Sequence, residues 1–128
     1  MIPLFNEQGY LPPGVHPATL QEIAERFSEA SELRRVEMES ICWLVELARR
    51  AGIQRLVLNG SFVTNRLEPN DVDCVLLMSA EYPVDPAADD ELEAGLPFLD
   101  LKRVRADQFD LFVQVIFATD RDNIPKKE

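Results

Sequence analysis

The sequence predicts an α+β domain, because helical and strand-like apolar patterns alternate along one short chain. Its 128 residues are about the length of one domain, and 46% of them are hydrophobic and 28% charged, which is typical of a globular protein. Apolar residues recur at helical spacing before residue 52, and short apolar runs follow it. We expect an extended N-terminal arm (1–18), one domain (19–119) and a polar C-terminal tail (120–128).

The arm is expected to be extended because prolines are concentrated in it. We expect its apolar residues to pack on the domain; they are Leu4, Phe5, Tyr10 and Leu11. A first helix is predicted after Thr19, which forms a capping box with Glu22 and precedes apolar residues spaced as on one helical face. A longer helix is predicted over about 31–51, with Gly52 as its C-terminal cap.

Two strands are predicted in the middle of the chain. The run 53–58 is short, branched and apolar, and the run 71–78 is apolar at both sets of alternating positions beyond its acids. Such a pattern is typical of a central strand that is covered on both faces. A short helical turn is expected between them, at 62–66.

Three further elements are predicted towards the C-terminus. A helix is expected at 86–93, because Asp85 and the following proline suit the N-cap and first helical positions. The run 96–104 is predicted to be a third strand. Apolar residues at helical spacing predict a last helix over 107–118.

The charge of the chain narrows its classes of partner. Thirteen basic residues face 23 acidic ones, so the formal net charge is −10 and the isoelectric point is near 4.5. A surface of this sign repels phosphate backbones, and nucleic acid is therefore not expected as a partner. Much of the excess lies in residues 81–93, which hold six acidic residues and no basic one.

The sequence also predicts a cytoplasmic protein without structural zinc. The first residues lack the basic and apolar regions of a signal peptide, and no apolar run is long enough to span a membrane. Cys42 and Cys74 are far apart, and His16 is the single histidine, so the four ligands of a zinc site are not present. Both cysteines lie in apolar runs and are expected to pack as small hydrophobic residues.

The chemically informative segment is Gly60-Ser61, nine intervening residues, and then Asp71-Val72-Asp73. Acids at i and i+2 of a strand project from one face, and two such charges about 4 Å apart repel by roughly 4 kcal/mol at an effective dielectric near 20. A cation would relieve this repulsion, and carboxylate oxygens are the ligands that Mg²⁺ prefers. We therefore expect a magnesium site at Asp71 and Asp73.

Gly60 and Ser61 predict an anion site beside these acids. They follow an apolar strand and open a turn, where glycine permits close approach of a ligand and backbone N–H groups bind anions. The Ser61 hydroxyl adds a further donor. An anion-binding turn after one strand and a metal-binding pair on the next are together the two halves of a nucleoside triphosphate site.

This pattern resembles the nucleotidyltransferase superfamily that shares the catalytic core of DNA polymerase beta. More narrowly, the segments FNEQGYLPPGVHPATLQEIAERF, LNGSFVTNRLEPNDVDCVLL and FATDRDNIPKK look like small, largely uncharacterised bacterial nucleotidyltransferase-like proteins. They cover about half the chain. The resemblance implies a small mixed β-sheet flanked by helices, a nucleoside triphosphate such as ATP as substrate, and two Mg²⁺ ions held by three carboxylates.

Carried over to this sequence, the resemblance assigns the phosphate-binding turn to Gly60 and Ser61 and the first two carboxylates to Asp71 and Asp73. The third carboxylate and general base is expected at Asp100, in the predicted strand 96–104. Asp110 is the alternative, ranked lower because its surroundings have helical periodicity.

The sequence departs from better-known minimal members of the superfamily in one respect. Where they have Arg-Gly shortly after Gly-Ser, this chain has Thr64-Asn65, and Arg66 is the candidate to contact phosphates instead. The main hypothesis is a nucleotidyltransferase that acts on a hydroxyl of a protein or small molecule, with a toxin as a partner suggested by analogy. The alternative is an inactive protein of the same fold that binds a partner, and a structural divalent-cation site is a third hypothesis.

Overall fold

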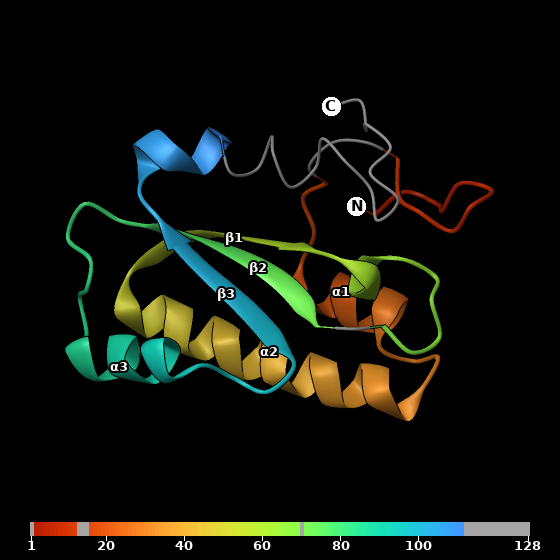
Figure 1. Cartoon of the computed structure of the whole chain (residues 1–128), viewed down its shortest axis with the longest axis horizontal. Helices are drawn as coiled ribbons and strands as arrows, with labels where there is room; N and C mark the ends of the chain where they lie inside the picture. The colour runs from red at the N-terminus through yellow and green to blue at the C-terminus, as the bar shows by residue number, and fades with distance from the viewer. Residues whose placement is uncertain (1, 13–15, 70, 112–128) are drawn as a thin grey trace.

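A mixed three-stranded sheet forms the centre of the computed structural model, which describes residues 2–12, 16–69 and 71–111. The strands are β1 (Ile53–Asn59), β2 (Val72–Met78) and β3 (Leu99–Val104), in the order β1-β2-β3. β1 and β2 are antiparallel, whereas β2 and β3 are parallel. The expected α+β class and the mixed sheet flanked by helices are therefore confirmed (Figure 1).

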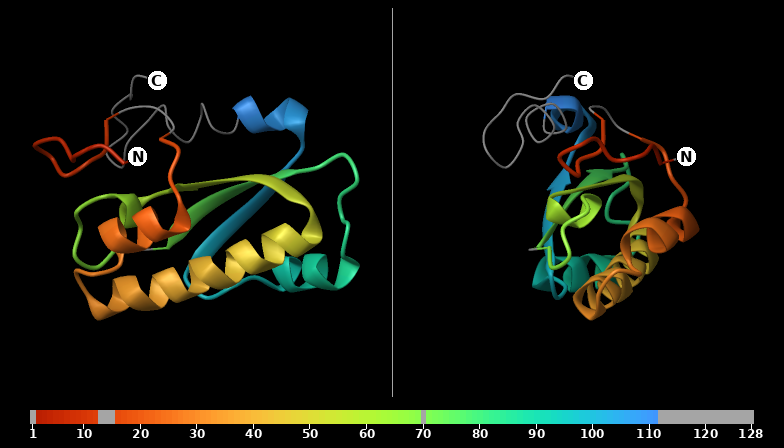
Figure 2. Two further views of the ribbon diagram at one scale, coloured as in Figure 1. Left: turned by 180° about the vertical axis from the view of Figure 1, so that it is seen from behind. Right: turned by 90° about the vertical axis from the view of Figure 1, so that its right-hand side faces the viewer.

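Three helices cover one face of this sheet: α1 (Leu20–Phe27), α2 (Glu32–Ala51) and α3 (Pro86–Ala94). Figures 1 and 2 show all three on the same side, with the short helical segment 106–111 on the opposite side near one end. The helices begin and end where local sequence signals predict. Thr19 and Glu22 form the capping box of α1, and Gly52 caps α2.

The central strand β2 buries apolar side chains on both faces, as its sequence predicts. Val72, Cys74 and Leu76 belong to the core cluster beneath the helices. Val75 and Leu77 belong to a second cluster on the opposite face, completed by Val57, Val104 and Phe109. Because Phe109 lies on the segment 106–111, that segment covers one end of the second face. Polar residues of the sheet lie at the other end of this face.

The N-terminal arm is attached to the domain by a cationic side chain and an aromatic row. The guanidinium of Arg26 lies 4.4 Å from the ring centroid of Phe5 and donates hydrogen bonds to the carbonyl oxygens of Ile2 (3.3 Å) and Pro3 (2.7 Å). The rings of Phe5 and Phe27 are 6.1 Å apart, and those of Phe27 and Phe62 are 5.8 Å apart.

The expected packing of the arm holds for some of its apolar residues. Phe5 and Leu11 pack against the core, and Tyr10 is half-buried and bridges to Thr64, but Leu4 is 84% exposed.

Three details differ from the sequence-based expectations. The third strand begins at Leu99 rather than at residue 96, because the chain turns at Phe98 with a φ of +67°. The helical turn lies at Ser61–Val63 instead of 62–66. Cys74 is buried as expected, but Cys42 is exposed on α2.

The end of the chain lies partly outside the description. Residues 106–111 are helical, as expected, but the remainder of the helix expected at 107–118 and the tail expected at 120–128 lie outside the described residues. Within the described ranges, no helix combines the length and apolar character needed to cross a membrane.

Candidate functional site

The turn after β1 and the acids of β2 are in contact. Gly60 adopts φ +89° and ψ −169°, a backbone conformation that is strained for residues with a side chain. A Cβ atom at Gly60 would lie 3.1 Å from Oδ2 of Asp73 and 3.3 Å from the backbone oxygen of Asp71. The absence of a side chain at Gly60 thus allows the Asp73 carboxylate to lie against the turn.

The strand register brings a third acid into the same row. Asp73 pairs with Asn59 of β1 on one side and with Asp100 of β3 on the other. Since paired residues project from the same face, the carboxylates of Asp73 and Asp100 share the second face of the sheet. They lie near the starts of β2 and β3, whereas Figure 1 shows the segment 106–111 beside the opposite ends of these strands.

The electrostatics of Asp73 show that the acids are close together. Burial raises the pKa of Asp73, the charges of Asp100 and Asp71 raise it further, and Lys102 opposes the shift. Lys102 lies 3.7 Å from Oδ1 of Asp100, and the side chains of this pair are about half exposed. Negative charge is therefore concentrated here with one nearby lysine to offset it.

These acids supply the hard oxygen ligands that suit Mg²⁺. As the side chains are placed, however, no group of three His, Cys, Asp or Glu within the described ranges is arranged to hold a metal ion. Asp100 is oriented to Lys102 instead. The donor types and the crowded negative charge thus fit a divalent cation, but a three-carboxylate site requires side chains to move from their positions here.

Asp110 and Arg66, the other two candidate residues, lie outside the row of acids on the strands. Asp110 lies on the helical segment 106–111 and is exposed, so it is not part of the strand row. Arg66 is exposed as well. Its backbone N–H donates to Oγ1 of Thr64 (3.2 Å), and its carbonyl oxygen accepts a hydrogen bond from Arg34 (2.9 Å).

Arg34 is a residue of the site region that the sequence analysis missed. Its side chain is almost fully buried, at 2% exposed, beneath the turn that follows β1. The guanidinium donates hydrogen bonds to the carbonyl oxygens of Phe27 (2.8 Å), Phe62 (2.8 Å), Thr64 (2.7 Å) and Arg66 (2.9 Å). One side chain of α2 thereby fixes the path of the turn from below.

Glu37 lies one helical turn after Arg34 and is also buried, at 1% exposed. Burial raises its pKa to about 7; the charge of Arg34 opposes this shift, and that of Asp71 adds to it. Its Oε1 atom is buried and forms no hydrogen bond within the described part of the chain. Asp71 therefore raises the pKa of both Asp73 and Glu37, which shows that Glu37 belongs to the same acidic end of the sheet.

A signal for these two residues is present in the sequence. Arg34, Glu37, Met38 and Ile41 occupy the spacing i, i+3, i+4 and i+7, which places them on the buried face of α2. Two charged residues on an apolar stripe are unusual, because a buried charge needs partners. Arg34 and Glu37 could therefore have been identified as candidates from the sequence.

The fold and the site define an α+β protein with an acidic cluster beside a glycine turn. The chain belongs to the family described as "Family of unknown function (DUF6932)", whose model matches residues 3–126. No curated protein and no solved structure matches the chain. The case for a function therefore depends on the geometry of the site.

Replacement of Gly60 by alanine tests the contact between the turn and the acids. Gly95 is a matched control, because its φ of +90° and ψ of 163° resemble those of Gly60, but a Cβ there would have nothing within 4 Å. We expect Gly95→Ala to lower the free energy of unfolding by about 1–3 kcal/mol through backbone strain, and Gly60→Ala to lower it further. Urea denaturation measures both, and equal losses would show that the contact with Asp73 has no energetic weight.

Proposed function

We propose that this protein is a Mg²⁺-dependent nucleotidyltransferase that transfers a nucleoside monophosphate from a nucleoside triphosphate, such as ATP, to a hydroxyl group. One observation carries the proposal: the Asp73 carboxylate lies against Gly60, and the register pairs Asp73 with Asp100 on the same sheet face. The turn for the polyphosphate and the acids for the cation are thus neighbours, as this chemistry requires.

The orientation of one peptide in the turn supports the proposal, but Ser61 and Phe62 are 4% and 0% exposed, so the loop must open for a polyphosphate to reach their N–H groups. The Ser61 carbonyl accepts hydrogen bonds from the N–H of Thr64 (3.2 Å) and from its hydroxyl (2.6 Å), inside the protein. Because a planar trans peptide directs its N–H opposite to its carbonyl oxygen, the Phe62 N–H points away from this buried network. The Asp73 carboxylate occupies the space beside Gly60, and Arg66 is exposed in the same loop.

The acids have two roles in the proposed reaction. Asp71, Asp73 and Asp100 would hold the two Mg²⁺ ions, which supply positive charge to offset the charge of the phosphates. Asp100 accepts the proton of the attacking hydroxyl. The hydroxyl oxygen forms a bond to the α-phosphorus, the bond from that phosphorus to the α–β bridging oxygen breaks, and pyrophosphate leaves.

The acceptor in this proposal is a protein or a small molecule in the cytoplasm. The net charge of −10 disfavours a nucleic acid, since two polyanions repel each other. A toxin protein that the enzyme modifies is one such acceptor, which would make this chain the antitoxin half of a pair.

The proposal predicts stabilisation by nucleotide that depends on the acids. We expect ATP with Mg²⁺ to raise the melting temperature of the wild-type protein, equivalent to about 2.7 kcal/mol at a ligand concentration of 100 times Kd. Asp71→Asn and Asp73→Asn are expected to abolish this shift. Asp110→Asn is the matched control, since Asp110 lies outside the strand row, and it is expected to retain the shift.

Two outcomes would contradict this proposal. One is the lack of a shift with any of the four ribonucleoside triphosphates and Mg²⁺. The other is a shift that Asp73→Asn leaves unchanged, because nucleotide would then bind away from the acids. A shift with Mg²⁺ alone that nucleotide does not increase would indicate a structural cation site.

The alternative function is a catalytically inactive protein that binds a partner. Two observations favour it: the acids within the described ranges are not arranged as a three-ligand metal site, and Thr64-Asn65 replaces the Arg-Gly of related enzymes. This alternative predicts no transfer of label from α-labelled ATP to any acceptor.

A further inference from the structure

β3 is an edge strand with a regular set of outward backbone groups. It pairs with β2 on one side, and among the described residues no strand pairs with its other side. The Val72 N–H donates to the Phe98 carbonyl oxygen (2.8 Å), so the backbone of Phe98 faces β2. Because backbone direction alternates along a strand, the backbone groups of Leu99, Leu101 and Arg103 point away from β2. The Leu99 N–H donates to the Leu96 carbonyl oxygen (3.3 Å), which leaves the N–H groups of Leu101 and Arg103 for a further strand.

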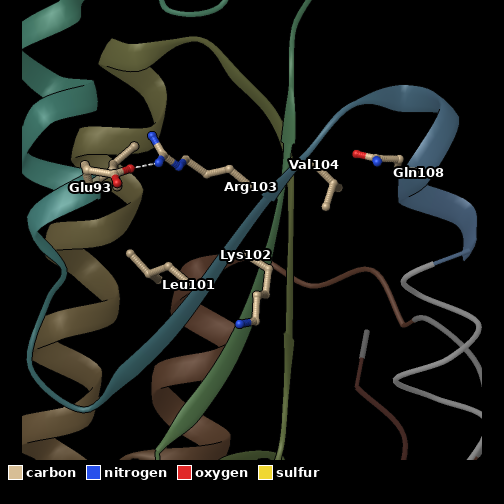
Figure 3. Close-up of a pocket in the computed structure, with 7 residues that line it drawn as sticks. Glu93, Leu101, Lys102, Arg103, Val104 and Gln108 are labelled. Atoms are coloured by element: carbon tan, nitrogen blue, oxygen red, sulfur yellow. Dashed lines mark hydrogen bonds and ion pairs between the residues drawn. The ribbon is translucent and has the colours of Figure 1, made fainter.

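The side chains around this edge leave it accessible. A hollow of about 390 Å³ runs along β3, between α3 and the segment 106–111. Figure 3 shows Leu101 and Arg103 on one side of the strand and Lys102 and Val104 on the other. Arg103 is held to α3 by Glu93, so the wall of the hollow is fixed. An exposed edge of this kind is a template for a further strand.

We propose that β3 pairs with β3 of a second copy of this chain, antiparallel and about a two-fold axis, to form a continuous six-stranded sheet. The backbone directions require outward-facing residues to pair with outward-facing ones, which an axis at Asp100, Leu101 or Lys102 would satisfy. An axis at Leu101 gives the greatest overlap and sets Leu101 opposite the partner's Leu101 as a hydrogen-bonded pair. Leu99 is then opposite the partner's Arg103, and its carbonyl oxygen accepts from the partner's Arg103 N–H.

The charges select this register among those that the backbone directions allow. With Leu101 at the axis, Asp100 lies opposite the partner's Lys102, and the symmetry repeats this pair. Both residues project from the second face of the sheet, and both are about half exposed and free to reorient. A register with Lys102 or Asp100 at the axis would set like charges directly opposite each other.

Sedimentation velocity over a wide range of protein concentration tests this interface. We expect wild-type protein to reach twice the 14.5 kDa mass of one chain as its concentration rises. Lys102→Asp and Asp100→Lys each replace two attractive pairs by repulsive ones, and each is expected to weaken the dimer about tenfold or more. The double variant restores opposite charges across the axis and is expected to dimerise like the wild type.

Cysteine cross-linking tests the register itself. The Cα atoms of a hydrogen-bonded antiparallel pair lie about 5.5 Å apart, within the range of a disulfide. In a Cys42→Ser background, which removes the exposed native thiol, Leu101→Cys is expected to form a covalent dimer on oxidation. Leu99→Cys is the control, because its partner equivalent lies four residues along, roughly 13 Å away.

Three outcomes would contradict this interface. A monomer at all concentrations, a dimer indifferent to the charge reversals, or equal cross-linking at residues 99 and 101 would each overturn the proposed interface. These readouts are mass and covalent linkage, so they do not depend on nucleotide binding or catalysis. The dimer can therefore stand if the nucleotidyltransferase proposal fails, although both proposals use the Asp100 carboxylate and cannot use it at the same time.

Discussion

Replacement of Arg34 by methionine is expected to lower the free energy of unfolding by about 4 kcal/mol. Each buried acceptor that loses its donor costs about 1–3 kcal/mol, because it stays buried without compensation. Here the loss leaves the carbonyl oxygens of Phe62 and Thr64 without their guanidinium donor. It also removes the positive charge that opposes the raised pKa of Glu37. Urea denaturation at pH 7, followed by circular dichroism, measures the effect.

Two variants make this prediction specific to the hydrogen-bond network. Arg35→Met changes the neighbouring arginine, which is exposed, and is expected to alter stability by less than about 0.5 kcal/mol. Arg34→Lys keeps the charge but lacks the planar fork that reaches several carbonyl oxygens at once, so it is expected to recover only part of the loss. If Arg34→Met and Arg35→Met had similar effects, Arg34 would not hold the turn in place.

The second large effect is a dependence of the free energy of unfolding on pH, which comes from Glu37. The pKa of Glu37 in the folded protein is about 7, against an ordinary value of 4.5. Between these values the folded protein keeps a proton that the unfolded chain has lost. The stability contributed by this proton is fully present below pH 4.5 and is lost as pH rises through 7, by about 3 kcal/mol in total.

Glu37→Gln is expected to remove most of this pH dependence, since the amide resembles the protonated acid and does not titrate. The variant should therefore be more stable than the wild type at pH 8 and similar to it at pH 5. Denaturation in EDTA across this range measures the difference, and the exposed Glu39→Gln on the same helix is the control. Parallel stability profiles for wild type and Glu37→Gln would contradict a buried, protonated Glu37.

The sequence predicts the elements of this fold well because their signals are local. The capping box at Thr19, the glycine after α2 and the aspartate before α3 each act on residues within one turn. The start of β3 is less predictable. Pro97 disfavours a strand through residues 96–98, but nothing in their composition indicates the left-handed backbone of Phe98.

The candidate site, too, is only partly predictable from the sequence. The spacing between Gly60 and Asp73 points to a turn and an acid on neighbouring strands, and their contact follows from the antiparallel pairing of β1 and β2. The contacts of Arg34 are with backbone carbonyl oxygens about 30 residues away. Backbone groups are the same in every residue, so no pattern of side chains identifies these partners.

The attachment of the N-terminal arm has a practical consequence for recombinant production of the protein. Gly9 accepts a hydrogen bond from the Asn65 N–H (3.0 Å), Tyr10 bridges to Thr64, and Phe5 continues the aromatic row to Phe62. A truncation that removes residues 2–12 as a dispensable leader would strip one wall from the loop beside the acids. Recombinant versions intended for ligand screening should keep this segment and carry any affinity tag beyond it.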